Sequence, residues 1–173
     1  MEILLPDFIR LLSTFNKHKV GYVIIGGYAV IFHGYERLTT DIDLLIEPTQ
    51  ENKTRIIAAL KDFGIDKLFL KEIESSHFSD AHVFSFGEPP RKIDLLTKIN
   101  HVNYDTAIPK INYFTIDNEQ IPVIGYHDLI LSKMTNDRGK DKGDVEELQR
   151  IHNYKFKNEQ VSFIERIKKW IFK

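Results

Sequence analysis

One stretch of the sequence decides the fold: Gly26-Gly27-Tyr28-Ala29-Val30-Ile31-Phe32-His33-Gly34-Tyr35-Glu36-Arg37-Leu38-Thr39-Thr40-Asp41-Ile42-Asp43-Leu44-Leu45-Ile46. An apolar run over Gly21–Ile25 precedes it and predicts a buried strand that stops at the two glycines. The residues after the glycines predict a short helix over about Tyr28–His33 and a second strand over Thr40–Ile46. This order of strand, glycine turn, helix and strand is typical of a sheet with helices packed against it.

Two aspartates alternate with apolar residues on the second strand. Asp41 and Asp43 leave the same face, about 6.6–6.8 Å apart along the chain, while Ile42 and Leu44 point into a core. Two carboxylates about 4 Å apart repel each other by about 4 kcal/mol at an effective dielectric constant near 20. A divalent cation between them removes this repulsion, and hard oxygen ligands favour Mg²⁺ or Mn²⁺ over Zn²⁺. For an Asp-x-Asp pair taken alone, the alternative is the solvated polar face of a half-exposed strand.

Two further features favour a metal and phosphate site. Lys92-Ile93-Asp94-Leu95-Leu96 repeats the Ile-Asp-Leu-Leu pattern of the first acidic strand, and an isolated acid in an apolar strand needs a partner. If the two strands are neighbours, Asp94 completes a cluster of three carboxylates. Gly26 and Gly27 open a helix, where backbone N–H groups can face a phosphate that glycine lets approach closely. A plain turn is the alternative for two glycines.

The rest of the chain predicts an α/β fold of the α+β type, with a mixed sheet flanked by helices and with C-terminal helices. Further elements are expected as helices over Ile3–Phe15, Gln50–Phe63, His127–Thr135, Lys142–His152 and Asn158–Ile171, and as strands over His82–Phe86, Lys92–Lys98, Ile111–Ile116 and Gln120–Ile124. We expect a single domain over residues 1–173, with a catalytic core of about 20–125 and a helical part of about 126–173. The strand-rich and helical parts meet near Asn136–Gly143.

The composition excludes several classes of protein. Fractions of 42% hydrophobic and 28% charged residues are ordinary for a globular domain and argue against disorder. A formal net charge of −1 gives no cationic excess for sequence-independent binding to duplex nucleic acid. Without cysteine, the chain has no thiol nucleophile, disulfide or Cys-based zinc site. No apolar run has the length of a membrane span and the N-terminus lacks a signal-peptide pattern, so we expect a cytoplasmic protein with no membrane partner.

The glycine turn, the Asp-x-Asp pair and the third acid together resemble the signature of the nucleotidyltransferase superfamily, whose fold is that of DNA polymerase β. The surrounding residues are similar to lincosamide-type and aminoglycoside-type nucleotidyltransferases and to abortive-infection toxins. The toxin-like families carry a helical lysine followed by Arg-x-Lys-Asp-x-x-Asp, and this pattern fits Lys133 followed by Arg138-Gly139-Lys140-Asp141-Lys142-Gly143-Asp144. The likeness covers about residues 20–150. Gly27 departs from the serine common in polymerases, so a hydroxyl contact to phosphate is missing there.

The resemblance implies a role for each of these residues. Asp41 and Asp43 would hold two metal ions, and Asp94 would help to bind the second and take the proton of the acceptor hydroxyl. Backbone N–H groups of Gly26 and Gly27 would cradle phosphates.

Four cations are the candidates for neutralising the triphosphate, and each has an alternative. Arg37 precedes the acid pair and would touch phosphate or pair with the neighbours of Glu36. Lys133 shares a helix face with a core residue, so its side chain would otherwise extend into solvent, and we expect Lys133→Ala to leave folding nearly intact. Arg138 and Lys140, with their acidic neighbours, would otherwise cap and decorate a solvated helix start.

The implied function is Mg²⁺- or Mn²⁺-dependent transfer of a nucleoside monophosphate from ATP or another NTP to a hydroxyl group. The acceptor would be a small molecule, a tRNA or a protein. The alternative is a non-catalytic nucleotide-binding or toxin–antitoxin-type regulatory protein that retains the fold. An apolar face over Val161–Ile171 is expected to dock on the core, with a partner protein or a homodimer as the alternative.

Overall fold

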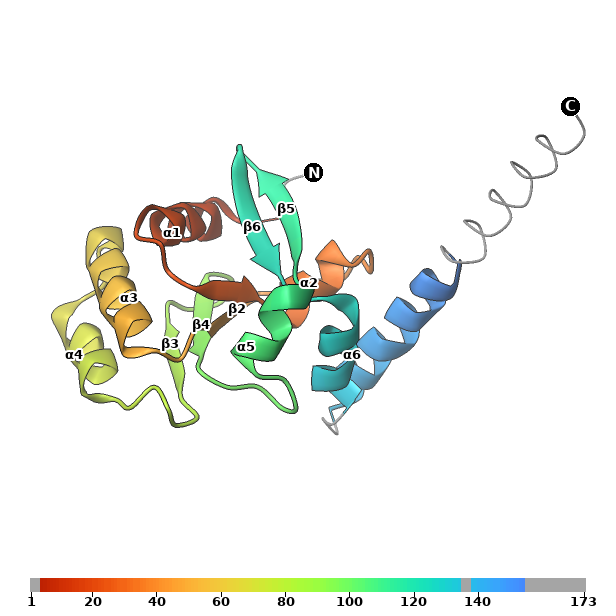
Figure 1. Ribbon diagram of the computed structural model, residues 1–173. Helices are drawn as coiled ribbons and strands as arrows, with labels where there is room; N and C mark the ends of the chain where they lie inside the picture. Colours follow the sequence, from red (N-terminus) through yellow and green to blue (C-terminus); the bar gives the residue numbers. More distant parts are fainter. Residues whose placement is uncertain (1–3, 135–137, 155–173) are drawn as a thin grey trace, which may run out of the picture.

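A mixed sheet of six strands forms the centre of the molecule, in the order β3-β4-β2-β1-β6-β5 (Figure 1). The computed structural model describes residues 4–134 and 138–154. The strands are β1 (Tyr22–Ile24), β2 (Asp41–Ile46), β3 (Val83–Phe86), β4 (Lys92–Leu96), β5 (Asn112–Ile116) and β6 (Glu119–Val123). β2 pairs antiparallel with β1 and parallel with β4, and β1 pairs parallel with β6. The mixed sheet and its flanking helices confirm the predicted fold class.

Helices surround this sheet. They are α1 (Pro6–Lys17), α2 (Gly26–Phe32), α3 (Gln50–Phe63), α4 (Lys67–Ser75), α5 (Tyr104–Ala107) and α6 (Tyr126–Met134), with a 3₁₀ turn η1 (Ile108–Lys110). Residues 139–154 are also helical. In Figure 1, α3 lies between α1 and α4 on the left of the sheet, and α6 lies beside the helical residues 139–154 on the right. The acidic stretches of β2 and β4 lie between these two groups.

The core explains why α1 and α3 form where they do. Four residues of α1 at helical spacing have no exposed surface: Phe8, Leu11, Leu12 and Phe15. Burying each such side chain stabilises the fold by about 1.5–3 kcal/mol. Thr49 caps the N-terminus of α3, where its side chain accepts a hydrogen bond from the Asn52 N–H, and Gly64 caps the C-terminus in the left-handed region at φ 100°. These two caps fix the helix at the bounds that the sequence predicted.

Several elements differ from the sequence-based expectation. α2 begins at Gly26, two residues before the predicted start, so both glycines belong to its first turn. α4 and α5 were not predicted; α4 begins at Asp66, whose carboxylate accepts hydrogen bonds from the N–H groups of Leu68 and Phe69. The predicted helix over Asn158–Ile171 and its apolar face lie outside the described residues.

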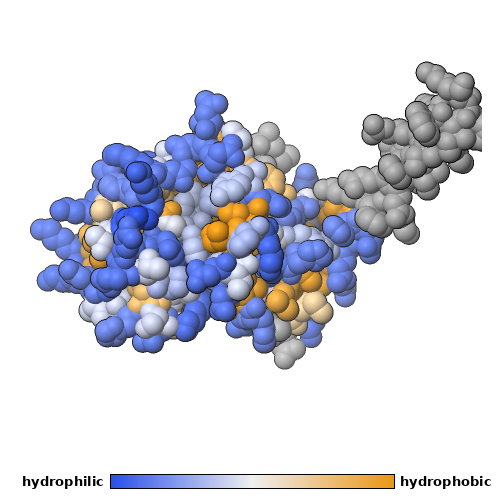
Figure 2. All heavy atoms as spheres, viewed as in Figure 1, coloured by the Kyte–Doolittle hydropathy of each residue, from blue (hydrophilic) through white to orange (hydrophobic). Residues whose placement is uncertain are grey.

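The surface is mostly polar on the face seen in Figure 2, where apolar residues show in small separate areas. Among the helices that the structure describes, none combines the length and the apolar character needed to cross a membrane.

Candidate active site

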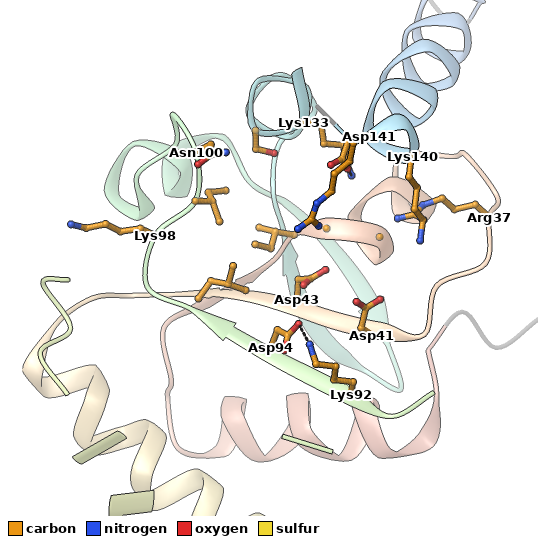
Figure 3. Close-up of a pocket in the computed structure, with 17 residues that line it drawn as sticks. Arg37, Asp41, Asp43, Lys92, Asp94, Lys98, Asn100, Lys133, Lys140 and Asp141 are labelled. Atoms are coloured by element: carbon orange, nitrogen blue, oxygen red, sulfur yellow. Dashed lines mark hydrogen bonds and ion pairs between the residues drawn. The ribbon is translucent and has the colours of Figure 1, made fainter. Parts of the chain in front are cut away.

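Three carboxylates lie together on the edge of the pocket formed above β2 and β4 (Figure 3). The parallel register sets Asp43 opposite Asp94 and Asp41 opposite Lys92. One carboxylate oxygen from each of Asp41, Asp43 and Asp94 lies within 4.8 Å of the others. The acids therefore share one open face of adjacent strands, as predicted, whereas their chemical roles stay a prediction.

Strand alternation positions these side chains. Ile42 and Leu44 have no exposed surface, and they hold the other face of β2 in the core. Because successive side chains of a strand point to opposite faces, the buried residues fix Asp41 and Asp43 on the pocket side. The alternating sequence pattern and the buried core residues therefore determine which face of β2 carries the two acids.

Repulsion within the cluster appears in the ionisation of Asp43. Burial raises the pKa of Asp43 to about 6, and the neighbouring carboxylates of Asp41 and Asp94 contribute to the rise. A hydrogen bond from the backbone N–H of Gly27 and the charge of Lys133 act in the opposite direction on this pKa. Three oxygen ligands without a full complement of cations form a suitable donor set for Mg²⁺ or Mn²⁺.

Polar neighbours orient the outer two acids. Asp94 accepts hydrogen bonds from the Ser85 hydroxyl at 2.5 Å and from the Lys92 ammonium at 2.7 Å. The bond to Asp94 raises the pKa of Lys92, so its ammonium stays charged. The Thr39 hydroxyl donates to Asp41 at 3.1 Å. Lys92 thus supplies one positive charge at the edge of the acid cluster.

The glycine turn lies directly against the acids. Gly26 has φ +60°, and a Cβ atom there would lie 1.8 Å from Asp43 Oδ2. A side chain at this position would therefore both strain the backbone and displace the carboxylate. Glycine is required here by the contact with Asp43.

The second glycine makes room for two other side chains. A Cβ atom on Gly27 would lie 2.4 Å from the Thr39 hydroxyl oxygen and 2.8 Å from Arg37 Nη2. The space that a serine would need is therefore occupied by Thr39 and Arg37. The Gly27 N–H already donates to Asp43. Where polymerases commonly carry a serine, the side chains of Arg37 and Thr39 therefore lie close to the turn in this chain.

Lys133 is buried, which rules out the alternative that its side chain extends into solvent. It is 6% exposed, and its ammonium lies 2.7 Å from Asp141 Oδ1 and 2.8 Å from Asp144 Oδ2. Removing a buried partner leaves a carboxylate uncompensated, so Lys133→Ala is no longer expected to leave folding intact. Asp144 is also not part of a solvated helix start, because it is only 2% exposed.

Arg37 shares the same acid. Its Nε lies 3.1 Å from Asp144 Oδ1, and both side chains are largely buried. The sequence did not suggest Asp144 as a partner of Arg37, whose guanidinium also reaches the glycine turn. Arg138 and Lys140 are exposed residues at the start of the helical residues 139–154.

One pocket of about 500 Å³ contains every candidate residue. The nine predicted residues that line it are Gly26, Gly27, Arg37, Asp41, Asp43, Asp94, Lys133, Arg138 and Lys140. In Figure 3, Arg37 and Lys140 lie together on one side of the acids, and Lys133 and Asp141 lie above them. The three carboxylates and a cationic wall of Arg37, Lys133, Arg138 and Lys140 therefore face one cavity.

Sequence reasoning gave no role to several other residues around this pocket. Lys92 and Lys98 line it, together with Asn100 and Ser132. Lys92 stands two residues before Asp94, and this spacing puts both side chains on one strand face, which was the available signal. Asp144 does not appear among the described lining residues, and only its acidic character in the toxin-like pattern pointed to it.

Comparisons with known proteins identify the family of the chain and proteins of similar fold. A family model described as "Nucleotidyltransferase of unknown function (DUF6036)" matches residues 4–158. The structure is similar to the lincomycin-bound lincosamide antibiotic adenylyltransferase LnuA, with a TM-score of 0.55 and 17% identity over 86% of this chain and 98% of that one. An antigenic nucleotidyltransferase-like protein from Paracoccidioides brasiliensis has a TM-score of 0.46 and 12% identity over 84% of this chain and 74% of that one. No curated protein matches the sequence.

Proposed function

The chain belongs to the family of nucleotidyltransferases of unknown function (DUF6036), and on this premise we propose that it transfers a nucleoside monophosphate from an NTP to a hydroxyl acceptor with Mg²⁺ or Mn²⁺. The observation that carries the proposal is the cluster of Asp41, Asp43 and Asp94, whose ligand oxygens lie within 4.8 Å of one another beside a cationic wall.

The donor set fits a hard divalent cation. All three ligands are carboxylate oxygens, and burial raises the pKa of Asp43, with a further contribution from the negative charges of Asp41 and Asp94. Asp41, Asp43 and Asp94 would hold the metal. When bound, Mg²⁺ or Mn²⁺ supplies positive charge that stabilises the attacking and leaving oxygens of an in-line displacement.

The acids also serve the proton transfer. Asp94 accepts the proton of the acceptor hydroxyl as the acceptor oxygen bonds to the α-phosphorus of the NTP. The bond from the α-phosphorus to the bridging oxygen breaks, and pyrophosphate leaves. Ser85 and Lys92 hold the Asp94 carboxylate in place through their hydrogen bonds.

The wall of the pocket binds the phosphates. Arg37, Lys133, Arg138 and Lys140 line the same cavity as the acids, so their positive charge can offset that of the triphosphate. Gly26 has no side chain to keep the phosphates away from Asp43. Orientation and charge compensation then supply the catalysis, as in phosphoryl-transfer enzymes generally.

The test is a transfer assay with each NTP carrying a label on its α-phosphate. The protein is incubated with the NTP, Mg²⁺ and a cell extract, and the label is located in small molecules, tRNA or protein. We expect covalent label in one fraction from the α-labelled NTP and label only in pyrophosphate from the γ-labelled NTP. Asp43→Asn is the control and should transfer nothing. NTP binding without any transfer would favour the non-catalytic alternative and overturn the proposal.

A further inference from the structure

We infer that Asp144 is a positioning residue. Its ion pairs with Arg37 and Lys133, made outside the pocket lining, orient both cations toward the nucleotide. The inference rests on the proposed function, since it concerns the binding of the NTP phosphates. It also makes the helical residues 139–154 part of the nucleotide site.

The contacts of Asp144 join three parts of the chain that are distant in sequence. Its Oδ1 lies 3.1 Å from Arg37 Nε in the segment between α2 and β2, and its Oδ2 lies 2.8 Å from Lys133 Nζ on α6. The carboxylate is thus divided between two cations, one oxygen for each. Asp144 is 2% exposed, so little water screens the attraction between its carboxylate and either cation. Lys133 donates a hydrogen bond to Asp144, whereas the Arg37 Nε contact is an ion pair without a hydrogen bond.

The arginine needs such a support. Arg37 lies in a segment without regular secondary structure, next to Leu38, which is 93% exposed. Arg37 Nε faces Asp144, while Nη2 reaches the place where a Gly27 Cβ would be. The guanidinium therefore spans from the carboxylate to the glycine turn. Without Asp144, an arginine in an irregular segment would gain several rotamers and lose this orientation.

Asp141 differs from Asp144 in a way that separates their roles. Asp141 lines the pocket and contacts Lys133 at 2.7 Å, whereas Asp144 lies outside the described pocket lining. An entering phosphate can therefore replace Asp141 on the Lys133 ammonium. Asp144 stays paired with Arg37 and Lys133 during this exchange.

The experiment compares Asp144→Asn with Glu147→Gln in nucleotide binding and turnover. Glu147 is on the same helical stretch and contacts only Arg150 among its described ion pairs, at 2.7 Å. We expect Asp144→Asn to raise the Kd and KM for NTP roughly tenfold while kcat changes by less than about threefold, and Glu147→Gln to change neither. In a double-mutant cycle, Asp144→Asn should weaken binding less in the Arg37→Gln background than in the wild type, because only its contact with Lys133 is then left to lose.

The alternative outcomes are distinct. A lower Tm for Asp144→Asn with unchanged NTP binding would mean that Asp144 only stabilises the fold, and would overturn the inference. Additive effects of Asp144→Asn and Arg37→Gln on the Kd would overturn it as well. If Asp144→Asn does not fold, Asp144→Glu replaces it: a raised KM with near-normal kcat supports the inference, and unchanged binding overturns it. A wild-type protein that binds no NTP overturns the proposed function and this inference together.

Discussion

Two groups of carboxylates lie at this pocket, and they are balanced in opposite ways. Asp41, Asp43 and Asp94 gather on neighbouring strands, where Lys92 is the cation that bonds to one of them. Asp141 and Asp144 lie on the helical residues 139–154 and are matched by buried cations. The negative charge of the first group is not fully balanced by neighbouring cations. The negative charge of the second group is balanced by Arg37 and Lys133.

This difference separates charges that need a ligand for their balance from charges that other side chains of the protein balance. A buried, paired carboxylate is part of the framework, because removing either partner exposes the other to an apolar surrounding. A cluster of like charges opposes folding unless a ligand arrives, so its presence indicates binding. The following experiments test whether the two groups differ in this way.

The largest effect is expected for Asp43→Asn. The substitution removes a central ligand from the acid cluster, so we expect turnover to fall by at least about 10⁴-fold, roughly 5.5 kcal/mol in transition-state stabilisation. Transfer of α-labelled nucleotide measures the loss. The Tm increase that Mg²⁺ and NTP give to the wild-type protein should shrink as well. Retention of both turnover and the full Tm increase in this variant would show that the cluster is not the metal site.

Lys133→Ala should give the largest loss of stability among the cations. Because the substitution leaves Asp141 and Asp144 without this partner, we expect the free energy of unfolding to fall by about 3–5 kcal/mol. Urea denaturation measures this change. Lys140→Ala is the matched control, since Lys140 is exposed and should change stability by less than about 0.5 kcal/mol. Equal losses for the two variants would contradict a framework role for Lys133.

The pH dependence of stability should separate the two groups. Asp43 has a pKa of about 6 in the folded protein and 3.8 as its ordinary value, so the folded state holds more protons between these values. The acid therefore contributes its stability below pH 4 and loses it as the pH rises through 6, by about 3 kcal/mol. In metal-free protein, Asp43→Asn should equal the wild type at pH 4 and exceed it by about this amount at pH 7.5. A constant difference across this range would rule out the raised pKa as the cause.

The smallest effect is expected for Lys92→Met. The ammonium bonds to Asp94 at the edge of the cluster and is partly exposed, so its loss should lower the free energy of unfolding by about 1 kcal/mol without metal. Saturating Mg²⁺ should reduce this deficit, because the metal supplies charge to the same carboxylate. Lys17→Met, which removes an exposed pair with Asp62, serves as a control whose deficit should not respond to Mg²⁺.

Much of the fold follows from local patterns. The acidic strand, the glycine turn and α3 with its caps at Thr49 and Gly64 were predicted because neighbouring residues determine them. α4 was missed although Phe69, Leu70 and Ile73 recur at helical spacing and pack against the core. A second signal was the capping residue Asp66.

The part of the site that depends on strand patterns was predictable, and the part that depends on tertiary contacts was not. A repeated strand pattern sufficed to group Asp94 with the other acids, since parallel neighbours align equivalent residues. The burial of Lys133 and Asp144 was not predictable, because it depends on the approach of helical residues 139–154 to α6 and Arg37. A sequence pattern gives the charge of a residue but not the partner that will balance it.

The parallel pairing of β2 with β4 also has a consequence for folding kinetics. α3, α4 and β3 lie between β2 and β4 in the chain. Pairing of β2 with β4 therefore closes a loop of roughly 50 residues, and this costs conformational entropy before the strand contacts stabilise the chain. The same step sets Asp43 opposite Asp94, and two like charges meet as the strands dock. We therefore expect stopped-flow refolding to accelerate when Mg²⁺ is present from the start, provided that the acids already attract the ion in the transition state. The negative charge that we propose binds the ligand is thus also expected to slow folding.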